Sequence, residues 1–236
     1  MRVVVRKEEL TPGGVLRTNH LRAIVNILVD RGGFALIPSD TCYSLAARPI
    51  GGTLSKRINL ILDRETDPIS LAFDTSTRVG RWVEVDSDAK RLLDNLTPGP
   101  LTVVLPITEL YEPHVAAIVD DVIVAPDRTI GVRIPDSRIE TQLVTACNFP
   151  LTTVAVRTRD REKRAVTDFA LARQVVERGL AEAGENAPLA IVEGQQPFSR
   201  AHSTVVRVPG YEGLKYHVIR LGALSTDDLD AALRSV

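Results

Sequence analysis

Apolar residues follow two spacings along the chain, one typical of amphipathic helices and one typical of buried strands. In residues 20–33 they recur every three or four positions, which predicts a helix that ends at Gly32 and Gly33. Residues 34–38 form a compact apolar run, which predicts a buried strand. The same patterns predict helices at residues 54–64, 87–96, 169–184 and 225–233, and strands at 3–5, 69–73, 101–106, 130–135, 150–156, 189–194, 203–208 and 217–222.

The predicted helices and strands interleave along the whole sequence. Neither an internal repeat nor a Pro/Gly-rich linker divides them. We therefore expect one α/β domain over residues 1–236, with a twisted mixed sheet flanked by helices. Residues 109–129 follow neither pattern, and we expect a surface excursion there.

Composition narrows the class of protein. With 44% hydrophobic and 25% charged residues, the chain is typical of globular proteins with a sizeable core. Its net charge of -1 gives no overall field to attract nucleic acid or acidic membranes, so any anion site must be built locally. Cys42 and Cys147 fit neither a disulfide scaffold nor a zinc site, which suggests a reducing compartment.

Localisation and metal binding are constrained by the same composition. No apolar run of membrane length and no signal peptide stands out, so we expect a cytoplasmic protein without membrane partners. His20 and His202 lack nearby ligands at metal-site spacing, so we expect no metal centre and a structural or surface role for both histidines.

Polar side chains stand where several predicted strands begin or end. In open α/β sheets ligands bind at strand ends, and hydroxyl groups together with arginines suit a phosphate-bearing ligand. Taken singly, each such motif is more typical of a turn. The residues concerned are Ser39, Asp40, Thr41, Thr102, Arg133, Thr152, Thr153, Ser203, Thr204 and Arg220.

Taken in order, these motifs are more specific. PSDTCYSLA is followed by an arginine 21 residues beyond Tyr43, and then by LTPGPLTVVLP, IGVRIP, STVV and IRLG. The series resembles the YrdC/YciO family, which includes the threonylcarbamoyl-AMP synthases, and the resemblance covers about Leu21 to Leu233. It implies a YrdC-like fold and the condensation of L-threonine, bicarbonate and ATP to threonylcarbamoyl-AMP and pyrophosphate, with Mg²⁺ as the counter-ion of ATP. It also implies a link to tRNA threonylcarbamoyladenosine formation, with tRNA or tRNA-modification proteins as further partners.

The resemblance assigns site residues position by position. Thr41, Tyr43 and Arg64 would be catalytic, with Tyr43 lining the amino-acid pocket and Arg64 holding a carboxylate or phosphate. Residues that would bind substrate or nucleotide on this basis are Ser39, Asp40, Thr102, Arg133, Ser203, Thr204 and Arg220. To these we add Thr153, from the polar strand ends, and Arg157, from the segment where the family has S-A-N.

The sequence also departs from the family pattern. Leu62 stands where the family has the lysine of K-x-R, and Val154 to Arg157 contain neither the Ser nor the Asn of S-A-N. Ser44 replaces a glycine and Arg207 replaces an aspartate. If Arg157 enters the cleft, it would partly compensate for the missing lysine. The surrounding stretch RTRDREKR is typical of a solvated loop, or of a phosphate or RNA contact.

Three functions fit these observations. The first is a threonylcarbamoyl-AMP synthase. The second is a YciO-like divergent paralogue that binds or hydrolyses an adenylate, since that branch also lacks parts of the lysine and S-A-N set. The third is a non-catalytic RNA-binding module that uses the cleft and the arginines of residues 157–164.

Overall fold

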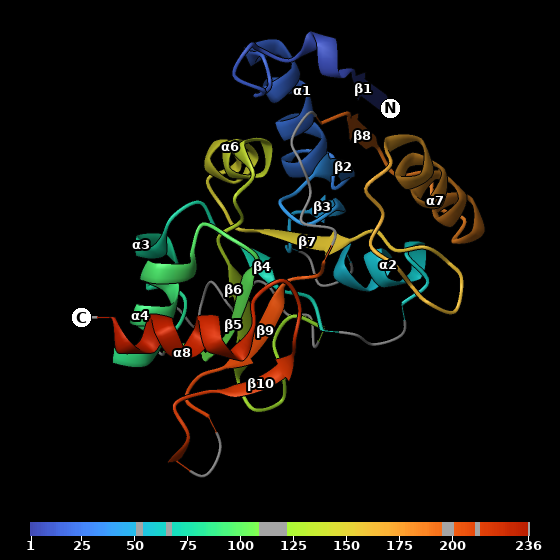
Figure 1. Ribbon diagram of the computed structural model, residues 1–236. Helices are drawn as coiled ribbons and strands as arrows, with labels where there is room; N and C mark the ends of the chain where they lie inside the picture. The colour runs from blue at the N-terminus through green and yellow to red at the C-terminus, as the bar shows by residue number, and fades with distance from the viewer. Residues whose placement is uncertain (51–53, 65–67, 109–121, 195–200, 211–212, 236) are drawn as a thin grey trace.

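The computed structural model describes the chain except residues 51–53, 65–67, 109–121, 195–200, 211–212 and 236 (Figure 1). Most of the surface excursion expected at residues 109–129 therefore lies outside the described residues. Within the described part, no helix has the length and apolar character needed to cross a membrane.

The described strands form one ten-stranded sheet in the order β1-β8-β2-β3-β7-β4-β6-β5-β9-β10. Four neighbouring pairs, β1–β8, β2–β8, β4–β6 and β5–β9, are parallel and the others are antiparallel, which confirms the predicted mixed sheet. The strands are β1 (Arg2–Val5), β2 (Phe34–Pro38), β3 (Tyr43–Ala47), β4 (Leu71–Ala72), β5 (Leu101–Pro106), β6 (Thr129–Arg133), β7 (Leu151–Ala155), β8 (Leu189–Val192), β9 (Thr204–Arg207) and β10 (His217–Arg220).

Helices cover the sheet in pairs, α1 with α6, α2 with α7 and α4 with α8 (Figure 1). A smaller apolar core lies under α1 and α6, and a larger one lies under the other two pairs. Most of both cores consists of the apolar faces that the sequence pattern marks, as the prediction of a sheet flanked by helices requires. The helices are α1 (Thr18–Val29), α2 (Leu54–Ile61), α3 (Ser76–Val79), α4 (Ser87–Leu96), α6 (Arg138–Cys147), α7 (Phe169–Glu182) and α8 (Thr226–Arg234), with a 3-10 turn η1 (Lys7–Glu9).

Four elements are absent from the sequence prediction: the short η1 and α3, and the longer β3 and α6. β3 follows β2 after a polar turn and pairs with it as a hairpin, with Pro38 opposite Tyr43. α6 carries an apolar face with Ile139, Leu143 and Val144 buried, but polar residues interrupt its pattern in the sequence. β3 and α6 both border the turn at residues 39–42, so the two longer missed elements are those that shape this polar strand end.

The end of α1 differs from the prediction by four residues. α1 ends at Val29, and Gly32 takes a left-handed φ of 58° in the turn that follows. At Gly33 a Cβ atom would lie 2.4 Å from the backbone oxygen of Pro188. The two glycines therefore allow a tight turn and a close approach to the β8 side of the sheet.

Gly179 allows α7 to pack closely against the end of α2. A Cβ atom at this position would lie 1.9 Å from the backbone oxygen of Ile61. We expect Gly179→Ala to destabilise the protein by about 1–3 kcal/mol through overpacking, although alanine favours helix formation. Urea unfolding would measure this, with Gly80→Ala as the control because its Cβ would have its nearest neighbours at 3.9 Å. Equal losses for the two variants would contradict the close approach.

Candidate functional site

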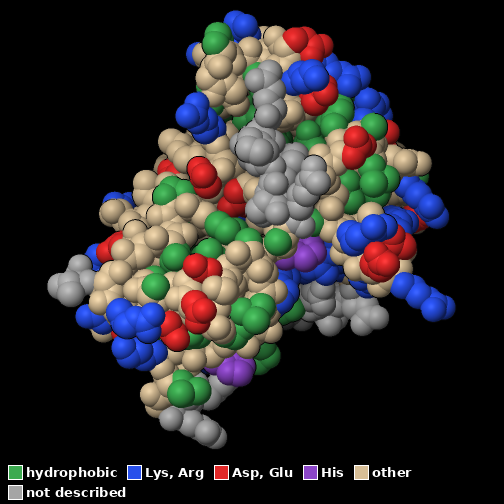
Figure 2. Space-filling view, in the orientation of Figure 1, with side chains coloured by type: hydrophobic (Ala, Val, Ile, Leu, Met, Phe, Trp, Pro, Cys, Tyr) green, Lys and Arg blue, Asp and Glu red, His purple; other side chains and the backbone are tan. Residues whose placement is uncertain are grey.

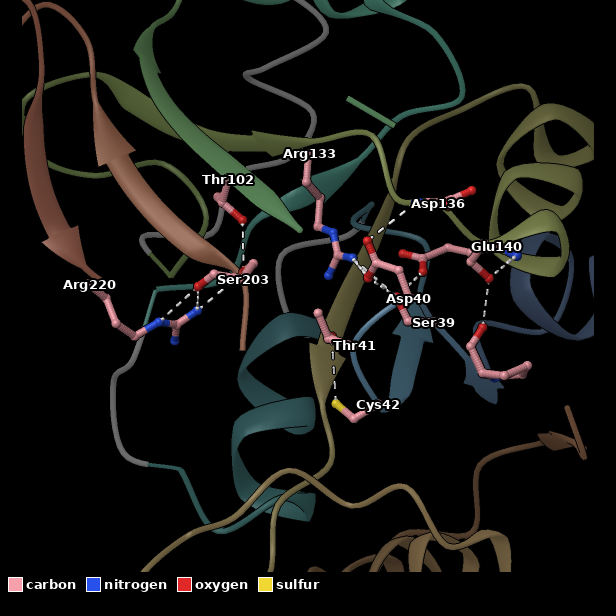
Figure 3. A network of polar contacts seen from close by, with 12 residues as sticks. Ser39, Asp40, Thr41, Cys42, Thr102, Arg133, Asp136, Glu140, Ser203 and Arg220 are labelled. Atoms are coloured by element: carbon pink, nitrogen blue, oxygen red, sulfur yellow. Dashed lines mark hydrogen bonds and ion pairs between the residues drawn. The ribbon is translucent and has the colours of Figure 1, made fainter. Parts of the chain in front are cut away.

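The turn between β2 and β3 carries the first polar cluster (Figure 3). The Arg133 guanidinium, at the end of β6, donates to the Asp40 carboxylate at 2.6 Å and to the Ser39 hydroxyl at 3.1 Å. The backbone N–H of Asp136 donates to the second Asp40 oxygen at 3.3 Å. Arg133 and Asp40 side chains are 6% and 7% exposed, so this is a buried ion pair between two distant segments of the chain.

Glu140, which the sequence prediction missed, completes this cluster from α6. The Ser39 hydroxyl donates to the Glu140 carboxyl at 2.5 Å. Ser137 caps the start of α6; its hydroxyl donates to the backbone oxygen of Pro38 at 2.9 Å and accepts from the Glu140 N–H at 3.4 Å. The S-x-x-E signal at residues 137–140 marks a helix start, but in a capping box the glutamate would turn back to Ser137. Here its side chain turns toward Ser39 instead.

Burial and neighbouring charges shift the pKa values of this cluster in opposite directions. Burial raises the pKa of the Glu140 carboxyl, and the Arg133 charge opposes that shift only in part. Burial alone would lower the pKa of the Arg133 guanidinium, but the charges of Asp40 and Glu140 outweigh it and raise that pKa. The Thr153 hydroxyl, on β7, also opposes the rise in the pKa of Glu140. The positive charge of Arg133 is therefore balanced inside the protein.

A second cluster joins β5, β9 and β10. The hydroxyl groups of Thr102 and Ser203 are 3.2 Å apart, and both residues are buried. Arg220 donates to the backbone oxygen of Ser203 at 2.9 Å and to its hydroxyl at 3.3 Å (Figure 3). Val103 and Val132 pair within the larger core, so the adjacent Thr102 and Arg133 point to the opposite face of the sheet.

Thr204 serves the backbone rather than an open pocket. Its hydroxyl donates to the backbone oxygen of Leu224 at 2.7 Å and accepts from the N–H groups of Gly222 and Leu224. A Cβ atom on Gly222 would lie 2.1 Å from the backbone oxygen of His202. The late Arg-Leu-Gly motif therefore presses tightly against residues 202–204 and holds that segment in place.

A pocket of about 190 Å³ lies where the loop after α2 meets the stretch after β7. It contains the predicted site residues Arg64 and Arg157, as well as Leu62 at the position of the family's lysine. Asp63 and Lys163 adopt left-handed φ values of 51° and 47°, which is uncommon outside glycine. The lining residues are Leu62, Asp63, Arg64, Arg157, Thr158, Arg159 and Lys163.

His202 links this pocket to the second cluster. Burial lowers the pKa of its imidazole to about 4, and the charges of Arg157, Arg220 and Arg64 contribute to that shift. A hydrogen bond to the backbone of Lys163 opposes it. On the face shown in Figure 2, a histidine side chain lies beside Lys and Arg side chains near the middle of the molecule. The charges of three arginines therefore act on His202, which the sequence prediction did not anticipate.

Cys42 and Thr41 lie toward the first cluster. The Thr41 hydroxyl donates to the Cys42 sulfur at 3.8 Å, and both residues are buried. Burial raises the pKa of the Cys42 thiol to about 11, while Arg133 and Arg157 act in the opposite direction. One buried thiol is therefore within electrostatic range of an arginine of the first cluster and of an arginine of the cationic pocket.

Tyr43 is buried in the described part of the structure, and its pocket-lining role stays a prediction from the family resemblance. It is 2% exposed, and its ring packs against Phe169 with centroids 5.8 Å apart. Its hydroxyl accepts from the backbone N–H of Gly194 at 3.1 Å. Burial raises the pKa of Tyr43, and the described residues that surround its ring belong to the larger core. Its described contacts are those of a core residue.

Comparison with known proteins identifies the family. The Sua5/YciO/YrdC family model, described as telomere recombination, matches residues 28–222. The chain belongs to this family. It is 28% identical to the threonylcarbamoyl-AMP synthase of Mus musculus over 209 residues, which cover 87% of this chain and 68% of that protein.

Solved structures of this family share its fold. P. abyssi Sua5 complexed with L-threonine superposes with a TM-score of 0.75 at 20% identity, over 99% of this chain and 61% of Sua5. E. coli YciO superposes with a TM-score of 0.71 at 18% identity, over 97% of this chain and 98% of YciO. The chain spans 60% and 68% of the length of two curated relatives named for threonylcarbamoyl-AMP synthase activity. These matches confirm the predicted YrdC-like α/β fold.

The buried ion pair predicts a large effect of removing one charge. Asp40→Asn would leave the Arg133 guanidinium buried without its carboxylate, and we expect a loss of about 3–5 kcal/mol in the free energy of unfolding. Urea unfolding would measure it. Asp94→Asn is the matched control, because the Lys90–Asp94 pair lies on an exposed helix face and contributes little. Similar losses for both variants would contradict the prediction that burial makes the removal of one charge costly.

Glu140 predicts a pH-dependent effect on stability. Because its pKa is raised in the folded protein, the unfolded chain loses this proton first, and stability falls as pH rises from about 4.3 through the folded pKa. Glu140→Gln removes this loss while keeping an oxygen that accepts from Ser39. We therefore expect the stability of the variant relative to the original protein to increase between pH 4 and pH 7, as measured by chemical unfolding. A difference that stays constant with pH would contradict the raised pKa.

Proposed function

We propose that this protein condenses L-threonine, bicarbonate and ATP to threonylcarbamoyl-AMP and pyrophosphate. The observation that carries the proposal is the gathering of Arg64, Arg157 and Arg220 around His202, beside a pocket of about 190 Å³. In a chain with a net charge of -1, this is a local site for a polyanion. The family membership and the synthase relative from Mus musculus support the same activity.

The chemistry needs positioning and charge neutralisation more than proton transfer. The threonine amine adds to carbon dioxide, formed from bicarbonate with loss of water, and gives a carbamate. A carbamate oxygen attacks the α-phosphorus of ATP, the bond from that phosphorus to the bridging oxygen breaks, and pyrophosphate leaves. Negative charge accumulates on the phosphate oxygens, so fixed guanidinium groups that are already oriented lower the barrier.

The two polar clusters suggest a division of roles. Arg64 and Arg157 would neutralise the phosphate chain, and Arg220 would act with the Thr102 and Ser203 hydroxyls at its other end. In this proposal the first cluster, which includes Ser39, Asp40, Arg133 and Thr153, fixes the turn that presents Thr41 to the substrates. Tyr43 and Thr204 would support the site through packing and backbone contacts.

Magnesium would arrive with ATP as its counter-ion. The described residues contain no group of three or more histidine, cysteine or carboxylate side chains that could hold a resident ion. Asp63, a carboxylate in the pocket lining, is compatible with Mg²⁺ bound mainly by phosphates, because this ion is commonly held by one or two carboxylates plus substrate oxygens. The product would pass to the modification of tRNA, with tRNA or its modifying proteins as partners.

Leu62 favours a second candidate, a YciO-like enzyme that hydrolyses an adenylate. Its side chain is 7% exposed and places an uncharged group in the pocket with Arg64. Val154 and Val156, in the segment aligned with S-A-N, are also buried apolar residues. A site with less positive charge would stabilise a departing pyrophosphate less well, which would weaken the forward reaction more than binding of a finished adenylate.

The RNA-binding alternative is less well supported by the geometry of residues 157–164. Arg159 pairs with Glu182, and Arg164 pairs with Asp160 and Glu162. These pairs neutralise part of the cationic stretch locally. An RNA-binding module would show salt-sensitive RNA affinity that survives Arg64→Ala but falls when this stretch is neutralised.

One assay separates these functions. Synthase activity would appear as pyrophosphate release that requires threonine, bicarbonate and ATP together, and we expect Arg64→Ala to lower its rate by about 10²-fold. Arg161→Ala, at an exposed position of the same cationic stretch, is the control and should retain the rate. Release of AMP from supplied threonylcarbamoyl-AMP without the forward reaction would favour the YciO-like candidate. Absence of both reactions would overturn the enzyme proposal.

A further inference from the structure

His202 stands on a rigid backbone at the junction of the two cationic groups. The backbone N–H of Ala223 donates to the backbone oxygen of His202 at 2.8 Å, and Arg220 holds the next residue, Ser203. The imidazole reaches the wall of the pocket, where it hydrogen-bonds to the backbone of Lys163. A side chain anchored at both ends in this way cannot easily turn away from its neighbours.

The charged groups around His202 are arginines from three separate segments. Arg64 comes from the loop after α2, Arg157 follows β7, and Arg220 ends β10. Asp63 is the carboxylate in the described lining of the adjacent pocket, and Lys163 contacts the imidazole through its backbone. The positive charges of these arginines disfavour an imidazolium as long as no anion is present.

We propose that His202 is a proton-linked ligand of the polyphosphate anion: it is neutral while the cluster of Arg64, Arg157 and Arg220 is empty, and it takes up one proton from water when the anion binds. The imidazolium then adds a fourth positive charge and an N–H donor to the site. The inference rests on the proposed function only in requiring a phosphate anion at this cluster.

Electrostatics supports both a neutral imidazole in the empty site and a protonated one in the complex. In the empty site, burial and the three arginines keep the pKa of His202 at about 4, so the imidazole is neutral at pH 6 and above. A bound polyphosphate offsets the guanidinium charges and adds an attractive partner, and both effects raise that pKa. Among the described residues of the site, the imidazole is thus the group whose charge follows occupancy, because arginine stays protonated throughout.

Proton uptake by His202 would also affect the proposed reaction. Before ATP binds, a permanent fourth cation would add repulsion to the arginine cluster. After binding, the protonated imidazole would stabilise pyrophosphate as it leaves, without that cost in the empty state. His202 would therefore be a charge-neutralising ligand whose strength is coupled to the presence of its substrate.

Calorimetric titration of the full chain with sodium pyrophosphate tests the inference. The titration is done at pH 6.0 in two buffers of different ionisation enthalpy, which gives the number of protons taken up on binding. If the pKa of His202 in the complex returns to its ordinary value of about 6.5, the original protein should take up at least about half a proton more than the His202→Gln variant does. On the same basis its affinity relative to the variant should rise about 4-fold between pH 8 and pH 6. Ionisation of pyrophosphate itself cancels in this comparison.

Controls separate this inference from the proposed function. His217→Gln, at an exposed histidine, should behave like the original protein. In NMR spectra, the imidazole resonance that is missing from the His202→Gln variant belongs to His202. This imidazole should titrate with a pKa of about 4 without ligand and with a higher pKa when pyrophosphate is bound.

Equal proton uptake by the original protein and His202→Gln would overturn the role of His202. If binding still depended on Arg64 in that case, the proposed phosphate site would stand. No pyrophosphate binding by either protein would overturn both.

Discussion

The buried ion pair between Asp40 and Arg133 is the contact on which the site depends. It joins the turn after β2 to the end of β6, and β3, β7 and β4 lie between those two strands in the sheet. Removing two charges from water is costly, and a buried pair of this kind need not add net stability. Its value here is geometric, because it fixes the turn at residues 39–42 relative to the strands that carry Thr102 and Arg133.

Helices could be read from the sequence where apolar residues alone form the buried face. The apolar spacing of residues 21–29 and 87–96 located α1 and α4, because solvent exposure of the other face leaves a clear period, although it placed the end of α1 four residues too late. β3 and α6 were missed because burial there involves polar groups. Ser44 lies fully buried inside β3, and Glu140 lies fully buried inside α6, so neither segment shows a simple alternation.

The site could be predicted only as a set of residue types at strand ends. Sequence identifies a hydroxyl or a guanidinium but not its partner: Thr204 bonds to the backbone, whereas Thr102 meets Ser203. The family resemblance brought Arg64 and Arg220 into the prediction, and Arg157 entered it as a candidate substitute for the missing lysine. In the structure the charges of all three act on His202. His202 itself was dismissed, since a lone histidine without metal-ligand spacing carries no signal until its neighbours in space are known.

Charge is distributed so that positive potential is concentrated in one place. Arg57 pairs with Glu185, Arg207 pairs with Asp127, and Arg133 is balanced by Asp40. These pairs remove cations from the surface field, which explains how a chain with nearly equal numbers of acidic and basic residues can still offer a cationic pocket.

An uncharged Leu62 fits this arrangement. Each cation added to an empty pocket is repelled by those already present, so the number of permanent charges is limited by the stability of the unliganded protein. With Arg64, Arg157 and Lys163 already lining the pocket, a lysine at position 62 would raise that repulsion and lower the pKa of His202 further. A titratable imidazole escapes the limit because it becomes charged only when an anion is present. The loss of one fixed cation and the gain of a conditional one are therefore physically consistent changes within a single pocket.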